Sequence, residues 1–391
     1  MKDLVNEIYA KVKLQEGPRI IEQMLVECYM SPGISTKELA RQLTLPLPVA
    51  AAIKKELIKS SILKQEKGVV CTNLGRSWME QTGGYQDIDR SLYRKFMKIE
   101  EGVELSELTQ EKEWHEWREI FNTRPQVNVQ IDQSKCTPET SMRRAILCLR
   151  NHALIGKRIL CVGDDDLVSV SLGFLLKHLF PGISESKAKI EVVDIDDRFL
   201  DYIRMIADRE NLPITCRHVD LREPLPSDMY GQFDTFFTDP PYTLQGASLF
   251  LSRGISALRS EKGLPIFLSF AHKSPDFMLA MQRELVRMGL TVGSTLPHFN
   301  EYEGAEMIAN RSQMIILKTT DHTVPEYTDR FKDALYTGEV KRTRRTYCCL
   351  ECAEIIRVGM DGEYQTIEAL KNEGCPCCKN STFKLKSKQE I

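Results

Sequence analysis

Between residues 158 and 318, short apolar runs that suit β-strands alternate with longer segments of helical spacing. A regular succession of strand, helix and strand builds a mainly parallel sheet that is covered by helices on both faces. A last antiparallel pair at 290–296 and 313–318 is expected to close the sheet. The other strands are expected at 158–162, 190–194, 214–219, 233–238 and 265–270, and the helices at 167–179, 199–211, 248–258 and 275–288.

The number and order of these elements fit an α/β fold of the class I methyltransferase-like, or Rossmann-like, type, which we place at residues 131–335. Residues 1–84 contain helical segments followed by a short hairpin, and Ser35 begins a capping box, so this part predicts a winged-helix-like domain. Residues 85–130 are expected to form a helical connector. Residues 336–391 hold a basic linker and a cysteine-rich tail.

Charge and composition exclude some partners. The formal net charge is only −2, which gives no general attraction to nucleic acid or to an anionic membrane. The apolar runs are far shorter than a membrane-spanning helix, and the N-terminus is charged where a signal peptide would be apolar. Six of the twelve cysteines lie singly in helical or strand-like segments, as buried free thiols do. We therefore expect a cytoplasmic protein without membrane contact.

Aspartates follow four of the predicted strands. One acid after one strand is equally well explained as a helix cap, but four strand ends that agree are not. Because the carboxyl ends of parallel strands meet at one edge of the sheet, these side chains are expected to surround a common ligand site. The candidate site residues are Gly163, Asp164, Asp165 and Asp166 after the first strand, Asp194 after the second, Asp220 after the third and Asp239 after the fourth.

The positions of these acids favour an adenosyl cofactor with a cationic tail. Asp194 stands where a carboxylate can accept hydrogen bonds from both ribose hydroxyls, and Asp220 is suited to the adenine amino group. The three consecutive aspartates from Asp164 would repel the carboxylate of S-adenosylmethionine and attract an ammonium group. We therefore expect decarboxylated S-adenosylmethionine as the cofactor.

The stretch Asp239-Pro240-Pro241-Tyr242 has the arrangement with which amino-methyltransferases hold a nitrogen nucleophile. The carboxylate of Asp239 and the carbonyl of Pro240 would accept hydrogen bonds from the amine, while Tyr242 packs beside it. An aliphatic amine is protonated at neutral pH and must lose a proton before it can attack a carbon atom, so the site needs a carboxylate base.

The tail contains two Cys-x-x-Cys pairs, a strong signal for a zinc ribbon. A site closed by four thiolates has no open position for a substrate, so the zinc is expected to be structural. The sets that are shifted by one position would use Cys348 or Cys377. The ligands we expect are Cys349, Cys352, Cys375 and Cys378.

The loop 163–166, the stretch from Val193 to Asp196 and the stretch from Asp239 to Thr243 resemble the branched-chain polyamine synthases, the family of N4-bis(aminopropyl)spermidine synthase. The resemblance covers about residues 15–335. It implies transfer of aminopropyl groups from decarboxylated S-adenosylmethionine to the secondary amine of spermidine, with release of methylthioadenosine. The zinc ribbon departs from the pattern expected of this family.

Carried over to this sequence, the resemblance makes Asp166 the first choice for the base and Asp165 the second. Asp165, Asp239, Pro240 and Tyr242 would bind the substrate amine. Loop order alone does not decide between the two bases.

Two other functions are consistent with parts of the sequence. An amino-methyltransferase that acts on nucleic acid would explain the winged helix, the ribbon and the Asp-Pro-Pro-Tyr stretch, but a polyanionic substrate requires basic residues around the site. A regulator without catalytic activity could use the same domain to sense a nucleoside or a polyamine. Formation of a homodimer is left open.

Overall fold

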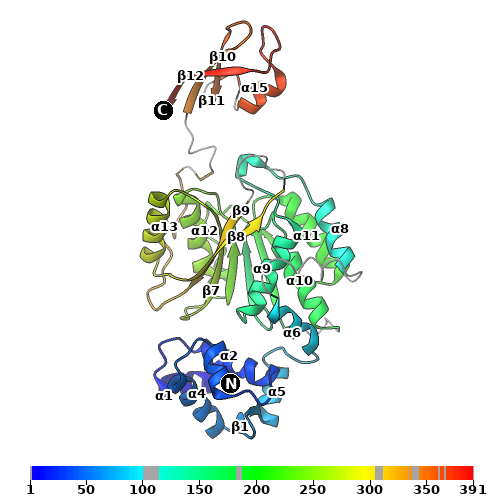
Figure 1. The fold of residues 1–391 in the computed structure, drawn as a ribbon, viewed down its shortest axis with the longest axis vertical. Helices are drawn as coiled ribbons and strands as arrows, with labels where there is room; N and C mark the ends of the chain where they lie inside the picture. Colours follow the sequence, from blue (N-terminus) through cyan, green and yellow to red (C-terminus); the bar gives the residue numbers. More distant parts are fainter. Residues whose placement is uncertain are drawn as a thin grey trace.

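The computed structural model describes residues 2–99, 114–181, 187–303, 311–333, 335–336, 343–359, 362–364 and 367–390. Figure 1 shows an N-terminal helical domain, a central domain built on a twisted sheet and a small C-terminal domain, in that order along the longest axis. None of the described helices is both long enough and apolar enough to cross a bilayer.

The central sheet has seven strands in the order β5-β4-β3-β6-β7-β9-β8. The first five in this order pair in parallel, whereas β9 pairs antiparallel with both β7 and β8. This order confirms the predicted α/β class, including the antiparallel pair that closes the sheet. The strands are β3 (Arg158–Val162), β4 (Lys189–Asp194), β5 (Ile214–His218), β6 (Thr235–Thr238), β7 (Pro265–Ala271), β8 (Thr291–Glu301) and β9 (Arg311–Lys318).

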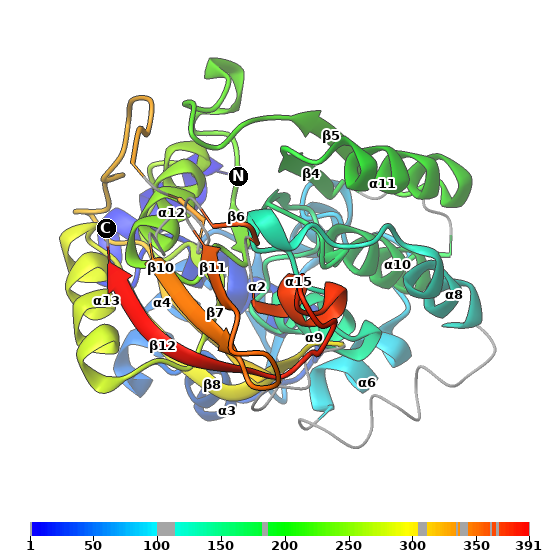
Figure 2. The same ribbon diagram turned by 90° about the horizontal axis from the view of Figure 1, so that it is seen from above.

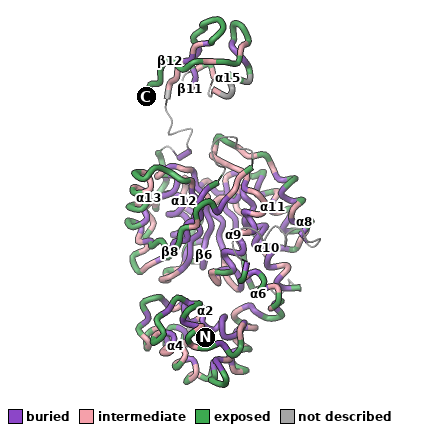
Figure 3. Tube along the Cα trace, in the orientation of Figure 1, coloured by how far each residue is buried: buried purple, intermediate pink, exposed green. Residues whose placement is uncertain are grey.

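Helices cover both faces of the sheet, and Figure 2 separates the two layers. Alternate residues of a strand point to opposite faces, so Ile159 and Cys161 of β3 join one apolar core while Leu160 and Val162 join the other. Figure 3 shows the resulting buried centre around the strands. The first core contains helices α9 (Pro138–Arg150), α10 (Val168–Leu179) and α11 (Asp197–Glu210), and the second contains α12 (Leu244–Ala257) and α13 (Pro275–Arg287).

The N-terminal domain has the expected order of helices followed by a hairpin. Ser35 caps α3, because its hydroxyl accepts a hydrogen bond from the backbone N–H of Glu38. The structure adds a first helix, α1, that the sequence pattern did not indicate. The elements are α1 (Lys2–Val12), α2 (Arg19–Met30), α3 (Thr36–Gln42), α4 (Leu47–Lys59), β1 (Leu63–Gln65), β2 (Val69–Cys71) and α5 (Asn73–Gln81).

The segment between these two domains contributes to the core of the central one. It contains α6 (Arg90–Lys98) and α8 (His115–Thr123). The indole of Trp117 is fully buried and donates a hydrogen bond to Ser171 of α10, while Trp114 stacks on His178 with ring centroids 3.9 Å apart. The described helices of this segment are therefore packed against the central domain.

The C-terminal domain is a three-stranded antiparallel sheet in the order β11-β10-β12. It has a small core of its own around Tyr347, Ile356, Val358 and Leu370. Its elements are β10 (Thr343–Cys349), β11 (Ile355–Gly359), α15 (Ile367–Glu373) and β12 (Phe383–Glu390).

Candidate active site

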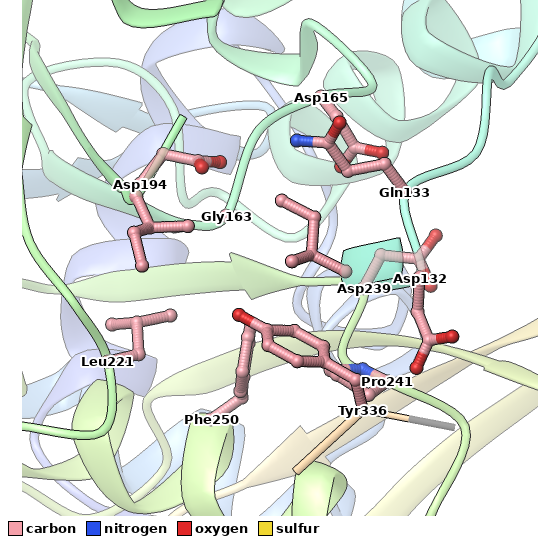
Figure 4. A pocket seen from close by; sticks show the side chains of 12 residues that line it. Asp132, Gln133, Gly163, Asp165, Asp194, Leu221, Asp239, Pro241, Phe250 and Tyr336 are labelled. Carbon is pink, nitrogen blue, oxygen red and sulfur yellow. The ribbon is translucent and has the colours of Figure 1, made fainter. Parts of the chain in front are cut away.

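A cavity lies at the carboxyl ends of the parallel strands, where the aspartates were expected to meet. The cavity is partly open to solvent, and residues from the ends of β3, β4 and β6 contribute to its lining. In Figure 4 the side chains of Asp165 and Gln133 lie on one side of this space, and those of Phe250 and Tyr336 lie on the other. The lining residues are Ile131, Asp132, Gln133, Gly163, Asp165, Asp194, Ile195, Leu221, Asp239, Pro241, Phe250 and Tyr336.

The loop after β3 needs glycine at its first position. Gly163 has φ +75°, a left-handed conformation that side chains rarely adopt, and a Cβ there would lie 3.6 Å from the ring of Phe250. The next residue, Asp164, points away from the cavity and caps α10 by accepting the backbone N–H groups of Val168 at 2.7 Å and Ser169 at 3.1 Å. Burial raises the pKa of Asp164 to about 7.

Asp165 is the member of this loop whose carboxyl group faces the cavity. One of its oxygens accepts the backbone N–H of Ser134 at 2.9 Å. The ion pairs of the described residues give Asp165 no cationic partner. Burial, together with the neighbouring charges of Asp166 and Asp194, raises its pKa well above the usual range of an aspartate.

Asp166 lies behind the cavity and is not one of its lining residues. Its Oδ1 accepts the backbone N–H of Cys136 at 2.8 Å, and its Oδ2 accepts Arg144 Nη1 at 2.7 Å. The side chain is only 4% exposed. This carboxylate is therefore engaged with the protein on both oxygens.

Of the two acids that were expected to hold the nucleoside, Asp194 lines the cavity and Asp220 does not. Asp194 lines the cavity, and its two oxygens accept the backbone N–H groups of Asp196 at 2.9 Å and Asp164 at 3.0 Å. Asp220 accepts the N–H of Arg222 at 2.9 Å, and its neighbour Leu221 lines the cavity in its place.

Asp239 reaches the cavity from the loop after β6. Its Oδ2 accepts the hydroxyl of Tyr302 at 2.6 Å and Nη2 of Arg144 at 3.0 Å. Burial raises the pKa of Asp239 to about 6 although the charge of Arg144 opposes the change.

The two other predicted residues of this loop, Pro240 and Tyr242, are not among those that line the cavity. Pro241 lines it, whereas Pro240 is buried and outside the lining. The hydroxyl of Tyr242 donates to that of Tyr302 at 3.2 Å, and its ring packs edge-on against Phe270.

Several lining and supporting residues were missed by the sequence reasoning. Asp132 and Gln133 follow a short helical turn, η2 (Val129–Ile131), inside the segment that was expected to be a connector or a domain boundary. Arg144 lies on α9, a helix that was not predicted. Thr137 followed by Pro138 is a typical helix start and could have indicated it. Tyr302 follows β8, which is longer than expected.

The four expected zinc ligands come together in the C-terminal domain. The sulfur atoms of Cys349, Cys352, Cys375 and Cys378 all lie within 4.8 Å of one another. A tetrahedral zinc with bonds of about 2.3 Å places its sulfur atoms about 3.8 Å apart, so this cluster fits the metal. Cys348 and Cys377 are not part of the cluster.

Comparison with known proteins agrees with this geometry. The family described as "Branched-chain polyamine synthase A C-terminal domain" matches residues 113–346, which is more than half of the chain. The chain belongs to the branched-chain polyamine synthase family. This assignment confirms the resemblance drawn from the acidic loop and the Asp-Pro-Pro-Tyr stretch.

Two relatives come from Methanocaldococcus jannaschii. An uncharacterised protein is 35% identical and covers 99% of this chain and 94% of its own length. The N(4)-bis(aminopropyl)spermidine synthase of the same organism is 30% identical and covers 77% of this chain and 83% of its own length. Among solved structures, the branched-chain polyamine synthase of Thermus thermophilus, in complex with N4-aminopropylspermidine and 5'-methylthioadenosine, is 22% identical with a TM-score of 0.49, covering 85% of this chain and 96% of that one.

Proposed function

We propose that this protein is an aminopropyltransferase that moves aminopropyl groups from decarboxylated S-adenosylmethionine to the secondary amine of spermidine. The products are N4-aminopropylspermidine, N4-bis(aminopropyl)spermidine after a second transfer, and methylthioadenosine. The observation that carries the proposal is the charge of the cavity: the described residues that line it include Asp132, Asp165, Asp194 and Asp239 and no lysine or arginine. A space of this kind suits a sulfonium donor and a polycationic acceptor, and repels a nucleic acid.

The donor fits the part of the cavity around the ends of β3 and β4. Asp194 would accept hydrogen bonds from the ribose hydroxyls, since it stands at the carboxyl end of the second strand. The apolar side chains of Ile195, Leu221 and Phe250 would contact the adenine. The acidic group nearest to the aminopropyl tail would then be Asp165.

The reaction requires a neutral amine. The secondary ammonium group of spermidine gives its proton to a carboxylate, and the nitrogen lone pair then attacks the methylene carbon attached to the sulfonium. A carbon–nitrogen bond forms as the carbon–sulfur bond breaks, and the electron pair of that bond goes to sulfur, which leaves as the thioether of methylthioadenosine. Asp239 would orient the nitrogen for this attack.

The contacts support Asp165 as the proton acceptor in place of Asp166, which was the first choice from the sequence. Asp165 reaches the cavity, and its raised pKa gives its carboxylate a high affinity for a proton. Bound cations would keep this group ionised before the transfer. Asp166 does not line the cavity, and Arg144 and the backbone N–H of Cys136 hold its two oxygens.

We propose that Cys349, Cys352, Cys375 and Cys378 hold a structural zinc that stabilises the small C-terminal domain. Four cysteines that stay reduced and bind a metal are typical of a reducing environment, which supports the cytoplasm as the compartment.

The test is incubation of the purified protein with spermidine and decarboxylated S-adenosylmethionine, with mass spectrometry of the products. Release of methylthioadenosine with a branched product supports the proposal. Methylation of DNA or RNA from ordinary S-adenosylmethionine would favour the methyltransferase, and binding without turnover would favour the regulator. Because one organism has both a synthase and a relative that spans this whole chain, longer linear polyamines should be tested beside spermidine.

A further inference from the structure

A buried arginine joins two of the three aspartates that were predicted to be catalytic. The side chain of Arg144 is 3% exposed. Its Nη1 donates to Asp166 at 2.7 Å, and its Nη2 donates to Asp239 at 3.0 Å and to the hydroxyl of Tyr302 at 3.2 Å. Its Nε donates to Asn300 at 2.9 Å. We call Arg144, Asp166, Asp239, Asn300 and Tyr302 the guanidinium network.

We propose that Arg144 is a positioning residue that assigns the roles of the three aspartates: it holds Asp166 and Asp239 in place as anions and leaves Asp165 to take the proton of the acceptor. This inference rests on the proposed aminopropyl transfer. It concerns a residue that does not line the cavity and that acts through its neighbours.

Arg144 supplies a positive charge between two buried carboxyl groups. Two buried carboxylates that lie close together cannot both stay ionised without a cation, because the like charge favours protonation of one of them. Arg144 supplies this cation to Asp166 and Asp239, and it lowers the pKa that burial raises at Asp239. Asp165 lies in the same loop as Asp166, but the ion pairs of the described residues give it no cationic partner. Burial holds its pKa well above the usual range of an aspartate.

Arg144 also orients the carboxyl group of Asp239. Arg144 and the hydroxyl of Tyr302 both bind Oδ2 of Asp239. These two bonds fix the rotation of the Asp239 carboxyl group at the edge of the cavity. The planar guanidinium can reach Asp166 and Asp239 from its two ends, whereas a lysine has a single ammonium group.

The charged and titratable groups around the network come from several elements. Asp166 and Asp239 face Arg144 from the loops after β3 and β6, and Tyr302 faces it from the end of β8. The buried thiol of Cys136 lies beside Asp166, and Tyr242 contacts Tyr302. Burial raises the pKa of the Cys136 thiol and of the Tyr242 and Tyr302 hydroxyls well above their ordinary values, whereas Asp239, with a pKa of about 6, titrates near neutral pH.

The experiment measures the titration of Asp239 directly and does not depend on turnover. Protein labelled with carbon-13 in the aspartate carboxyl groups is titrated by NMR, and the signal of Asp239 is assigned from its loss in Asp239→Asn. In Arg144→Gln the midpoint of Asp239 should rise by about one pH unit or more, because an arginine next to an aspartate lowers its pKa by about 1–3 units. An unchanged midpoint overturns the proposal.

The same variants are then assayed for release of methylthioadenosine across pH. In Arg144→Gln the acidic limb of kcat/KM should become deeper, because Asp239 is then protonated near pH 6, and activity there should fall about fivefold or more relative to activity on the alkaline side. Arg144→Lys should keep the limb near its original place and lower the plateau. A uniform loss at every pH, with the limb in place, would indicate a role in folding alone and would refute the proposal.

Tyr302→Phe provides a second probe of the Asp239 midpoint, and Arg150→Gln provides a control. Tyr302→Phe keeps every charge and removes the 2.6 Å hydrogen bond to Asp239, so it should raise the Asp239 midpoint even if Arg144→Gln does not fold. Arg150→Gln changes an exposed arginine on the same helix and should leave both the midpoint and the limb unchanged. If the wild-type protein releases no methylthioadenosine, the proposed function fails, whereas the NMR midpoints still decide the role of Arg144.

Discussion

The acidic cavity should discriminate strongly between two donors that differ by one carboxylate. Ordinary S-adenosylmethionine carries this group on the amine-bearing carbon, and the proposed pose places that carbon near Asp165. Two like charges about 4 Å apart repel by about 4 kcal/mol at an effective dielectric constant of about 20, which corresponds to a ratio of about 10³ in Kd. The wild-type protein should therefore bind decarboxylated S-adenosylmethionine about three orders of magnitude more tightly than its carboxylated parent.

The perturbation is Asp165→Asn, which removes one charge and keeps the shape of the side chain. It should reduce the ratio between the two Kd values by at least about tenfold, because the remaining Asp194 and Asp239 still repel the carboxylate. Competition calorimetry at about pH 8 measures both constants, since Asp239, with a pKa of about 6, is then ionised. The matched control is Asp201→Asn on α11, whose side chain is 74% exposed. Equal affinities of the wild-type protein for both donors, or a ratio that Asp165→Asn leaves intact, would refute the electrostatic reasoning.

Three further outcomes are expected. With saturating donor, Asp165→Asn should lower kcat by about 10²–10⁴, because it removes the general base. A kcat equal to that of the wild-type protein would instead favour Asp166 as the general base. Removal of zinc with a chelator, or Cys375→Ser, should abolish metal content by atomic absorption and lower the stability of the C-terminal domain; retention of a full equivalent of zinc in Cys375→Ser would contradict the ligand set. In the folded state Asp164 has a pKa of about 7, above the value of about 4 in unfolded chains, so folding is favoured when this group is protonated and Tm should fall as pH rises from about 4 to about 7. In Asp164→Asn this fall in Tm should be smaller. If the pH dependence of Tm is the same in Asp164→Asn, the raised pKa of Asp164 is contradicted.

The periodic elements of the central domain were predictable because their burial dictates their sequence. β3 is expected at 158–162 and lies at Arg158–Val162, and both of its faces are apolar because helices cover both sides of the sheet. The meeting of Asp165, Asp194 and Asp239 at one edge also followed from topology alone. The choice between neighbouring aspartates did not follow, because the turn from Gly163 to Leu167 decides which side chain faces the cavity.

Arg144 and Tyr302 could not be found in the same way. Arg144 lies on a helix before the first strand of the sheet, and Tyr302 follows the last residue of β8, so 158 residues separate the two partners along the chain. No local pattern reports such a contact. An arginine on an amphipathic helix is ordinarily solvated, and only the fold shows that this one is enclosed by carboxyl groups.

The edge strand β8 contains Asn300 and ends directly before Tyr302, and both residues accept hydrogen bonds from Arg144. Strands β8 and β9 are also synthesised after the other strands of the central sheet. A nascent chain that ends before residue 291 would already contain the guanidinium and its two carboxylates, but it would lack the amide and hydroxyl groups that complete their hydrogen bonds. Assembly of a competent catalytic centre should therefore wait for the final pairing of the sheet, so that the protein cannot bind and consume a reactive sulfonium compound before its synthesis has passed that point.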